Sequence, residues 1–368
     1  SGYSRDSGIS MTHEDGEAFV RALADAASRA GSSGRDLAAR LGVHTVSVSS
    51  SSTVSGSVVA VRLFPLPEDD LGFDTLGLLD AQIADLSAIV ANRQGLCLVA
   101  GPSGSGHARM LQVLVAEAAG LIGKRGVAMT VEESVQHKIP NAVQKRVVAG
   151  KQGSGHGVSD RDFADAIGEA MRVEPAIIMV SEVKGASSAA QCMDAAQSGR
   201  MVYAYVNATG ALEAVDRFAS DAFGVARDTV CDSRVIKALI GVRRVKRLCS
   251  DCSRPLSDAL GRVDDELRHR LAYDLQRGAL GKARVRGNAA DCPTCKGSGV
   301  AGVQILAEVV RLDSALREIL CKQGGSAARE HWMKHSSGIS MQAHARALVA
   351  QGEIDPRDAE DAVGLMYE

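Results

Sequence analysis

Residues 95–114 read GLCLVAGPSGSGHARMLQVL. An apolar run at 96–100 has the length of a buried strand, a glycine-rich loop follows it, and an apolar helical pattern continues from residue 108. The backbone N–H groups of such a loop, at the start of a helix, favour an anion such as phosphate. This stretch therefore predicts an α/β fold with a phosphate-binding loop.

The chain beyond this stretch keeps alternating short apolar runs with helical segments. VAMTV (127–131), AIIMV (176–180) and MVYAYV (201–206) are predicted as buried strands, and ARMLQVLVAEAA and DFADAIGEAMR as helices between strands. This alternation is typical of a largely parallel sheet covered by helices.

The loop has the spacing of G-x-x-x-x-G-K-[ST] but departs from it at the last two positions. His107 stands where a lysine would reach the outer phosphates, and Ala108 stands where a hydroxyl would hold Mg²⁺. Histidine is mostly neutral at neutral pH, and alanine offers no oxygen to a metal ion. Binding of ATP with Mg²⁺ is therefore expected to be weak. A plain strand-to-helix turn is the alternative. The candidate nucleotide-binding residues are Gly101, Pro102, Ser103, Gly104, Ser105, Gly106, His107 and Ala108.

Composition excludes several classes of protein. The 368 residues exceed one ordinary domain, which predicts two or three. A net charge of -2, from 42 basic and 44 acidic residues, argues against a strongly basic nucleic-acid binder. No apolar run approaches the length that spans a membrane, and no signal sequence opens the chain, so a cytosolic protein is expected.

The cysteines indicate a metal site. Two C-x-x-C pairs are separated by 39 residues, and two such knuckles complete a tetrahedral structural zinc site. A helical segment, ELRHRLAYDLQRG, is predicted between them; unrelated thiols or a redox pair are the alternatives. The candidate ligands are Cys249, Cys252, Cys292 and Cys295. The other four are interpreted as small buried hydrophobes: Cys97, Cys192, Cys231 and Cys321.

Several stretches, in order, resemble the ATPases of type II secretion and of type IV pilus extension. Residues 95–114 are similar to their Walker A region, and MTVEESVQHKIPNAVQ (129–144) to their acidic box. Residues 172–211 resemble their Walker B strand and histidine box, and VRRVKRLCSDC with DCPTCKGSGVAGVQILAEVVRLD their four-cysteine element. The resemblance covers about residues 45–320. Pilus-retraction relatives lack the four cysteines, which favours the secretion or extension branch.

The resemblance implies catalytic candidates and also shows departures from the family pattern. Glu182 stands at the Walker B glutamate, Glu132 at the first acidic-box position, and Arg62 at the second of two arginines that reach a nucleotide across subunits. Six functional positions are altered, which predicts weak or absent ATP hydrolysis and a scaffold or regulatory role. A slow but active ATPase that powers subunit extrusion is the alternative. The altered positions are Ser47, His107, Ala108, Gln136, Arg200 and Asn207.

The resemblance also implies a domain organisation. Residues 15–42, including RDLAARLG, are predicted as helical, and residues 45–64 as a hairpin. The chain is expected to contain a disordered tail (1–14), a partial N-terminal α/β domain with the hairpin (15–71), a RecA-like P-loop NTPase core (72–248), a four-cysteine zinc element (249–296) and a C-terminal helical region (297–368).

Such ATPases imply a hexameric ring, made of this chain alone or with an active paralogous ATPase. The expected partners are an inner-membrane platform protein and a cytoplasmic adaptor, and the expected location is cytoplasmic, at the inner membrane of a bacterium. No nucleic acid is expected, because VRRVKRL (242–248), with helical flanks, is interpreted as a solvated or subunit-contact face. His331 and His335 are interpreted as surface residues, and Trp332 as a packing anchor.

Overall fold

The computed structural model describes residues 71–135, 137–150, 158–263 and 265–366, together with residues 18 and 22 and the backbone of three N-terminal strands. Two compact units divide the chain, and each is described by itself. The first contains residues 1–70, 134–138 and 151–157, and the second contains the remainder. The predicted tail (1–14) lies outside the described residues.

The first unit contains an antiparallel sheet of β1 (Asp36–Leu41), β2 (His44–Thr53) and β3 (Gly56–Pro65). The predicted hairpin is confirmed, since β2 and β3 pair from His44↔Pro65 to Thr53↔Gly56. The helix predicted for RDLAARLG is wrong, because this stretch forms β1 and pairs with β2 along its whole length. The pattern of apolar and polar residues in this stretch fits the period of a strand as well as that of a helix, and pairing with β2 overrides the helical propensity.

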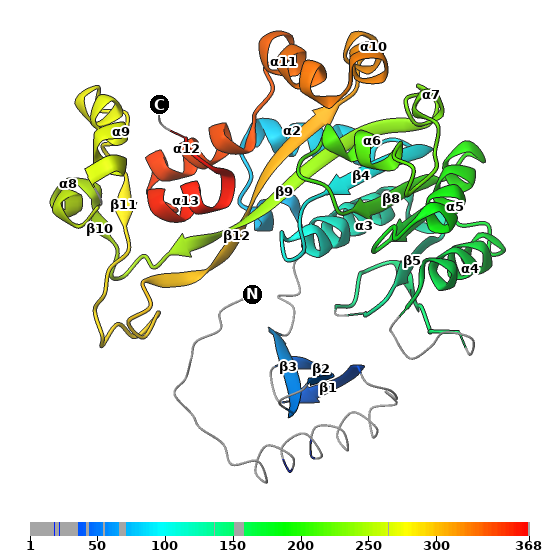
Figure 1. The fold of residues 1–368 in the computed structure, drawn as a ribbon, viewed down its shortest axis with the longest axis horizontal. Helices are drawn as coiled ribbons and strands as arrows, with labels where there is room; N and C mark the ends of the chain where they lie inside the picture. Colours follow the sequence, from blue (N-terminus) through cyan, green and yellow to red (C-terminus); the bar gives the residue numbers. More distant parts are fainter. Residues whose placement is uncertain are drawn as a thin grey trace. The chain divides into compact units, whose positions relative to one another are not determined.

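A seven-stranded sheet forms the centre of the second unit, in the order β12-β9-β4-β8-β7-β5-β6 (Figure 1). All neighbours pair in parallel except β12 and β9, which are antiparallel. The α/β class and the four predicted strands are confirmed. The strands are β4 (Gly95–Ala100), β5 (Ala128–Glu132), β6 (Ala142–Arg146), β7 (Ile177–Val180), β8 (Met201–Val206), β9 (Ile236–Leu248) and β12 (Val300–Arg311).

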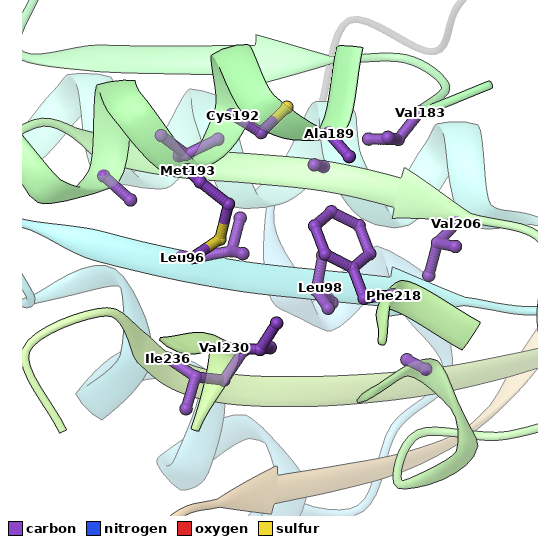
Figure 2. Close-up of a cluster of buried hydrophobic side chains, with 14 of the residues drawn as sticks. Leu96, Leu98, Val183, Ala189, Cys192, Met193, Val206, Phe218, Val230 and Ile236 are labelled. Atoms are coloured by element: carbon purple, nitrogen blue, oxygen red, sulfur yellow. The ribbon is translucent and has the colours of Figure 1, made fainter. Parts of the chain in front are cut away.

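Helices cover both faces of this sheet. One face packs against η1 (Phe73–Leu76), α2 (Asp80–Val90) and α3 (His107–Ile122). The other packs against α4 to α7 and α10 to α11, where Leu98 and Phe218 meet in a fully buried cluster (Figure 2). The helices on this second face are α4 (Asp160–Met171), α5 (Ala186–Gln197), α6 (Glu213–Phe218), α7 (Arg227–Val230), α10 (Ser314–Gln323) and α11 (Gly325–His335).

The two strands at one side of the sheet differ from the sequence prediction. Residues 297–368 were expected to be helical, but β12 occupies twelve of them. VRRVKRL lies within β9, so its predicted helical flanks are also wrong. Ile305 to Val310 are all buried, because helices cover both faces of β12, and a strand buried on both faces shows no alternation for sequence analysis to detect.

A third hydrophobic core joins the segment after the first cysteine pair to the end of the chain. The helix predicted between the cysteine pairs is confirmed as α9 (Asp265–Gln276). Its Leu267 and Leu271 belong to the same core as Leu348 on α12. The other elements of this region are β10 (Arg254–Pro255), α8 (Leu256–Ala259), η3 (Leu260–Arg262), β11 (Arg284–Val285), α12 (Met341–Gln351) and α13 (Pro356–Val363).

Trp332 is a packing anchor, as predicted. Its side chain is buried, and a Cβ added to Gly338 would stand 2.4 Å from the indole ring. Gly338 therefore allows the chain after α11 to pass directly over the ring. Among the described helices, none has both the length and the apolar character needed to cross a bilayer.

His344, on α12, is buried between two backbone groups. Its Nδ1 accepts from the Ala307 amide at 3.1 Å, which leaves the proton on Nε2, 3.1 Å from the Gly77 carbonyl oxygen. Burial lowers the pKa of His344 from its ordinary value to about 4. Protonation of Nδ1 would also break the bond from Ala307.

The His344→Gln variant is expected to remove part of the acid sensitivity of the fold. Because the pKa of His344 is lower in the folded state, its stabilising contribution is complete above about pH 6.5 and is lost as the pH falls towards 4. Between pH 7 and pH 5 this group alone is expected to reduce the free energy of unfolding by about 2 kcal/mol. Urea unfolding at both pH values measures this. An equal loss in the variant and the wild type would contradict it.

Candidate functional site

Four parallel strands carry their carboxyl ends to one edge of the sheet. The residues that follow or end these strands are Gly101 after β4, Asn207 after β8, Glu182 two residues after β7, and Glu132 at the end of β5. The structure therefore brings the predicted loop and both predicted acidic residues to the same edge. Ligands of open α/β sheets bind at this edge.

The loop between β4 and α3 depends on its glycines. Gly104 and Gly106 have φ values of 79° and 93°, which favour glycine. A Cβ on Gly101 would stand 2.7 Å from the Val242 carbonyl oxygen, and one on Gly106 would stand 3.2 Å from Cγ1 of Ile305. The loop thus lies tightly against β9 and β12 and presents the N-terminus of α3.

His107 does not project freely from this loop. Its ring stacks on the ring of Tyr205, with centroids 3.6 Å apart and planes 10° apart. The Ser105 hydroxyl lies 3.3 Å from Nδ1, and burial lowers the pKa of His107 to about 4. At pH 7 this side chain is therefore neutral and supplies no positive charge to the loop. The following side chain, Ala108, is an exposed methyl group.

Tyr205, on β8, was not predicted as a site residue, although its side chain contacts the loop. Its hydroxyl donates to the Gly101 carbonyl oxygen at 2.9 Å, and its ring covers His107. Burial, with a smaller effect of the Glu182 charge, raises the pKa of Tyr205 to about 12. The only sequence signal is its position at the end of an apolar strand.

Glu132 faces the interior of the protein. Its carboxylate is buried and accepts hydrogen bonds from the Thr130 hydroxyl at 2.5 Å and from the Gln144 amide at 3.0 Å. Burial raises its pKa, and the two hydrogen bonds oppose this effect. These contacts hold β5 and β6 together at the end of the sheet.

Glu182 is more accessible and has a cationic neighbour. The Lys184 ammonium lies 3.8 Å from Glu182 and 2.8 Å from Glu133, and it also donates to the Val158 carbonyl oxygen at 3.0 Å. Burial raises the pKa of Glu182, and Lys184 opposes this effect. Lys184 thus balances the acidic charge at this end of β7.

The remaining predicted positions are not all brought together. Arg62 and Ser47 are register partners on β3 and β2, which belong to the first unit. Gln136 lies outside the described residues. Arg200 precedes β8 and Asn207 follows it, so the two altered histidine-box positions lie at opposite ends of one strand and only Asn207 shares the edge with the loop.

The four predicted cysteines lie together and are positioned to bind a metal ion. Their sulfur atoms all lie within 4.8 Å of one another, with 3.7 Å between Cys249 and Cys292 and 3.4 Å between Cys252 and Cys295. A tetrahedral ion at about 2.3 Å from each thiolate requires sulfurs about 3.8 Å apart, so these residues fit a four-coordinate metal.

The backbone around the cluster is shaped for this arrangement. A Cβ on Gly287 would stand 1.7 Å from the Cys252 carbonyl oxygen, and one on Gly299 would stand 2.5 Å from the Gly287 oxygen. The Gly299 amide donates to the Cys295 sulfur at 3.2 Å, which stabilises a thiolate. The rings of His331 and His335 lie on α11 with centroids 4.7 Å apart and planes tilted by 36°, but among the described residues only the four cysteines form a metal-ligand group of three or more.

A second group of charged residues was missed by sequence analysis. The Arg329 guanidinium donates hydrogen bonds to the carboxylates of both Glu308 and Glu213. Glu308 also accepts a hydrogen bond from the Ala211 amide at 2.7 Å. Glu308 is almost completely buried. These three side chains and Arg243 line a cavity of about 520 Å³. The residues lie far apart in sequence, so no motif reveals them.

Solved structures with the same fold include an ATPase and a pilus retraction motor. The ATPase DotB of Legionella pneumophila matches 96% of this chain and 84% of its own, with a TM-score of 0.61 and 18% identity. The pilus retraction motor PilT, with bound ADP, matches 95% of this chain and 84% of its own, with a TM-score of 0.59 and 17% identity. These similarities establish the fold: a mixed α/β fold with a mainly parallel central sheet.

The family is established by sequence. Residues 25–361 match the family described as Type II/IV secretion system protein, and the chain belongs to this family. Type II secretion system protein HxcR of Pseudomonas aeruginosa is 26% identical over 75% of this chain and 50% of its own length. The type IV pilus assembly ATPase PilB of Thermus thermophilus is 26% identical over 73% of this chain and 28% of its own. The chain spans about half the length, or less, of these relatives.

Proposed function

We propose that the chain is a subunit of a ring-forming assembly that serves bacterial type II secretion or type IV pilus assembly. In this proposal the loop 101–108 is a nucleotide site with little or no ATP hydrolysis, and the subunit has a scaffold or regulatory role. Membership of the type II/IV secretion system protein family supports the system that is served.

The observation that carries the proposal of lost hydrolysis is the position of His107. A neutral ring packed on Tyr205 cannot neutralise phosphate oxygens, and the neighbouring Ala108 has no oxygen for Mg²⁺. Phosphoryl transfer depends on electrostatic stabilisation by such a cation and its metal ion. The backbone of the loop is still shaped to bind phosphate, so weak nucleotide binding remains part of the proposal.

Phosphate release from Mg-ATP by the purified chain tests the proposal. The wild type and the Glu182→Gln variant are expected to show the same background rate, because the site lacks the groups that act with Glu182. The double variant His107→Lys, Ala108→Thr is expected to bind Mg-ATP about tenfold more tightly, which corresponds to about 1.4 kcal/mol. Robust magnesium-dependent turnover by the wild type, abolished in Glu182→Gln, would refute the lost hydrolysis.

A slow active ATPase that powers extrusion of pilus or pseudopilus subunits is the second candidate function. The accessible Glu182 at the sheet edge and the retained Arg62 favour it, with Glu132 as a further acidic candidate. For this candidate, turnover would depend on assembly of the ring. Undetectable hydrolysis by the assembled ring in the presence of its platform protein would refute it.

The assembly and its location are part of the same proposal. We infer a hexamer of this chain, or a mixed ring with an active paralogous ATPase, on the cytoplasmic side of the bacterial inner membrane. Its partners would be an integral platform protein and a cytoplasmic adaptor, with no role for nucleic acid. The names of the relatives, which refer to secretion systems and pili, support this placement.

We also propose zinc as the metal of the four-cysteine cluster. Four thiolates at tetrahedral spacing match a closed structural zinc site, which leaves no position for a reacting water. Within the proposed domain organisation (1–14, 15–71, 72–248, 249–296 and 297–368) this element follows the nucleotide core. Its cysteines Cys249, Cys252, Cys292 and Cys295 would hold the ion.

A further inference from the structure

The basic run on β9 passes directly beside the phosphate loop. β9 pairs in parallel with β4 as far as Ala100↔Gly241, so the next residues of β9 run level with the loop. The Val242 carbonyl oxygen lies 2.7 Å from the position of a Cβ on Gly101. Arg244 follows two residues later on the same strand.

Arg244 lies on the face of the sheet that α3 covers. Ala238, Ile240 and Val242 are buried in the core that contains α3, and Arg244 continues this alternation. Its partner on β12 is Ile305, which belongs to the same core. Cγ1 of Ile305 lies 3.2 Å from the position of a Cβ on Gly106, immediately before α3. Directly opposite residues have Cβ atoms about 5 Å apart, so Arg244 stands one side chain away from the start of α3.

The guanidinium of Arg244 is not neutralised by the described part of the chain. The side chain is only partly exposed, and no described residue forms a hydrogen bond or an ion pair with it. Burial lowers its pKa, and no acidic group opposes this effect. Arginine nevertheless remains charged at all physiological pH values. A partly buried cation without a partner is unfavourable, and an anion would remove this cost.

The adjacent Arg243 has a different role. It points to the opposite face, where its guanidinium donates to the carbonyl oxygens of Val242 and Thr209 and lines the cavity with Glu308. Arg247, three residues after Arg244, is exposed and contacts the Ala301 carbonyl oxygen. Only Arg244, of these three, combines the correct face with an uncompensated charge.

We propose that Arg244 supplies the positive charge at the phosphate loop that His107 does not, so that the loop binds the diphosphate group of a nucleotide without Mg²⁺. This inference rests on the proposed nucleotide site at 101–108. The guanidinium can donate two parallel hydrogen bonds to phosphate oxygens, which a lysine cannot. Because Ala108 offers no metal ligand, affinity would depend on this arginine and on the backbone N–H groups of the loop.

Calorimetric binding of ADP and of inorganic pyrophosphate to the full chain, with EDTA or with Mg²⁺, tests the inference. The wild type is expected to bind ADP equally well, within about twofold, under both conditions. Arg244→Gln is expected to weaken binding at least tenfold, about 1.4 kcal/mol. Arg244→Lys, which keeps the charge but cannot donate two parallel hydrogen bonds, is expected to bind more weakly than the wild type and more tightly than Arg244→Gln. Arg247→Gln on the same strand is expected to bind as the wild type does.

Unchanged ADP affinity in Arg244→Gln, or no binding of ADP and pyrophosphate by the wild type, would overturn the inference. The first result would leave the proposed nucleotide site at 101–108 in place, whereas the second would refute that site as well. The proposed loss of hydrolysis is tested separately by phosphate release. Equal weakening in Arg244→Gln and Arg247→Gln would also overturn it, because that result would reflect general electrostatic attraction rather than a contact at the loop.

Discussion

Simultaneous replacement of Cys249 and Cys292 by serine is expected to abolish metal binding and to unfold the four-cysteine element locally. Together the two substitutions remove one thiolate from each knuckle, and the two remaining sulfurs cannot complete a tetrahedral site. Binding of structural zinc contributes about 10 kcal/mol or more to the folding of small zinc-dependent units. Elemental analysis of freshly purified protein should find zinc in the wild type alone.

Hydrogen exchange should locate the unfolding. Protection is expected to fall in α9 and in α12, which share a core with the segment between the cysteine pairs, whereas β4 and β8 should remain protected. Cys321→Ser is the matched control, because this cysteine lies outside the cluster. Absence of metal from the wild type, or equal protection in wild type and double variant, would contradict the prediction.

Arg329→Met is expected to destabilise the second unit by about 3 kcal/mol. The substitution keeps the apolar stem but leaves Glu308, which is almost completely buried, with the Ala211 amide as its one hydrogen-bond donor among the described residues. Removing one member of a buried ion pair leaves an uncompensated charge, which costs about 3–5 kcal/mol. Arg329 is about one third exposed, and this favours the lower end of the range.

Urea unfolding measures this loss, and a second substitution tests its cause. Arg329→Met combined with Glu308→Gln should recover at least about 1 kcal/mol, because the neutral amide can still accept from Ala211. Lys322→Ala breaks an exposed pair with Glu318 and serves as the control, with an expected change below about 0.5 kcal/mol. A loss below 1 kcal/mol in Arg329→Met would show that the charge is solvated after all.

The sequence predicted the features that depend on local patterns. The buried strands β4, β5, β7 and β8 were recognisable because each is a short apolar run beside a turn or a helix, and the glycine-rich loop 101–106 because it stands between such a strand and a helix. The cysteine cluster was recognisable because each C-x-x-C pair fixes two ligands on one knuckle. The family resemblance then supplied their order.

Other features depend on contacts between distant segments. β12 was predicted as helical because burial on both faces removed its alternation, and β1 because its pattern fits either structure. The stack of His107 on Tyr205 joins residues almost a hundred positions apart, and the contact of Arg329 with Glu213 joins residues more than a hundred positions apart. Such pairs are created by the sheet order and have no signature in a single sequence.

The long antiparallel ribbon of β9 and β12 has a mechanical consequence. It passes beside the glycine-rich loop, where the Val242 carbonyl oxygen lies 2.7 Å from the position of a Cβ on Gly101, and β9 ends at Leu248, immediately before Cys249. Nine consecutive register pairs from Val303↔Lys246 onward fix the two strands against each other, so neither can slide alone. The part of β9 from Val242 to Leu248 spans about 20 Å between the loop and the cysteine element. A small rotation of the ribbon at the loop would therefore displace the cysteine element at its far end by a larger distance.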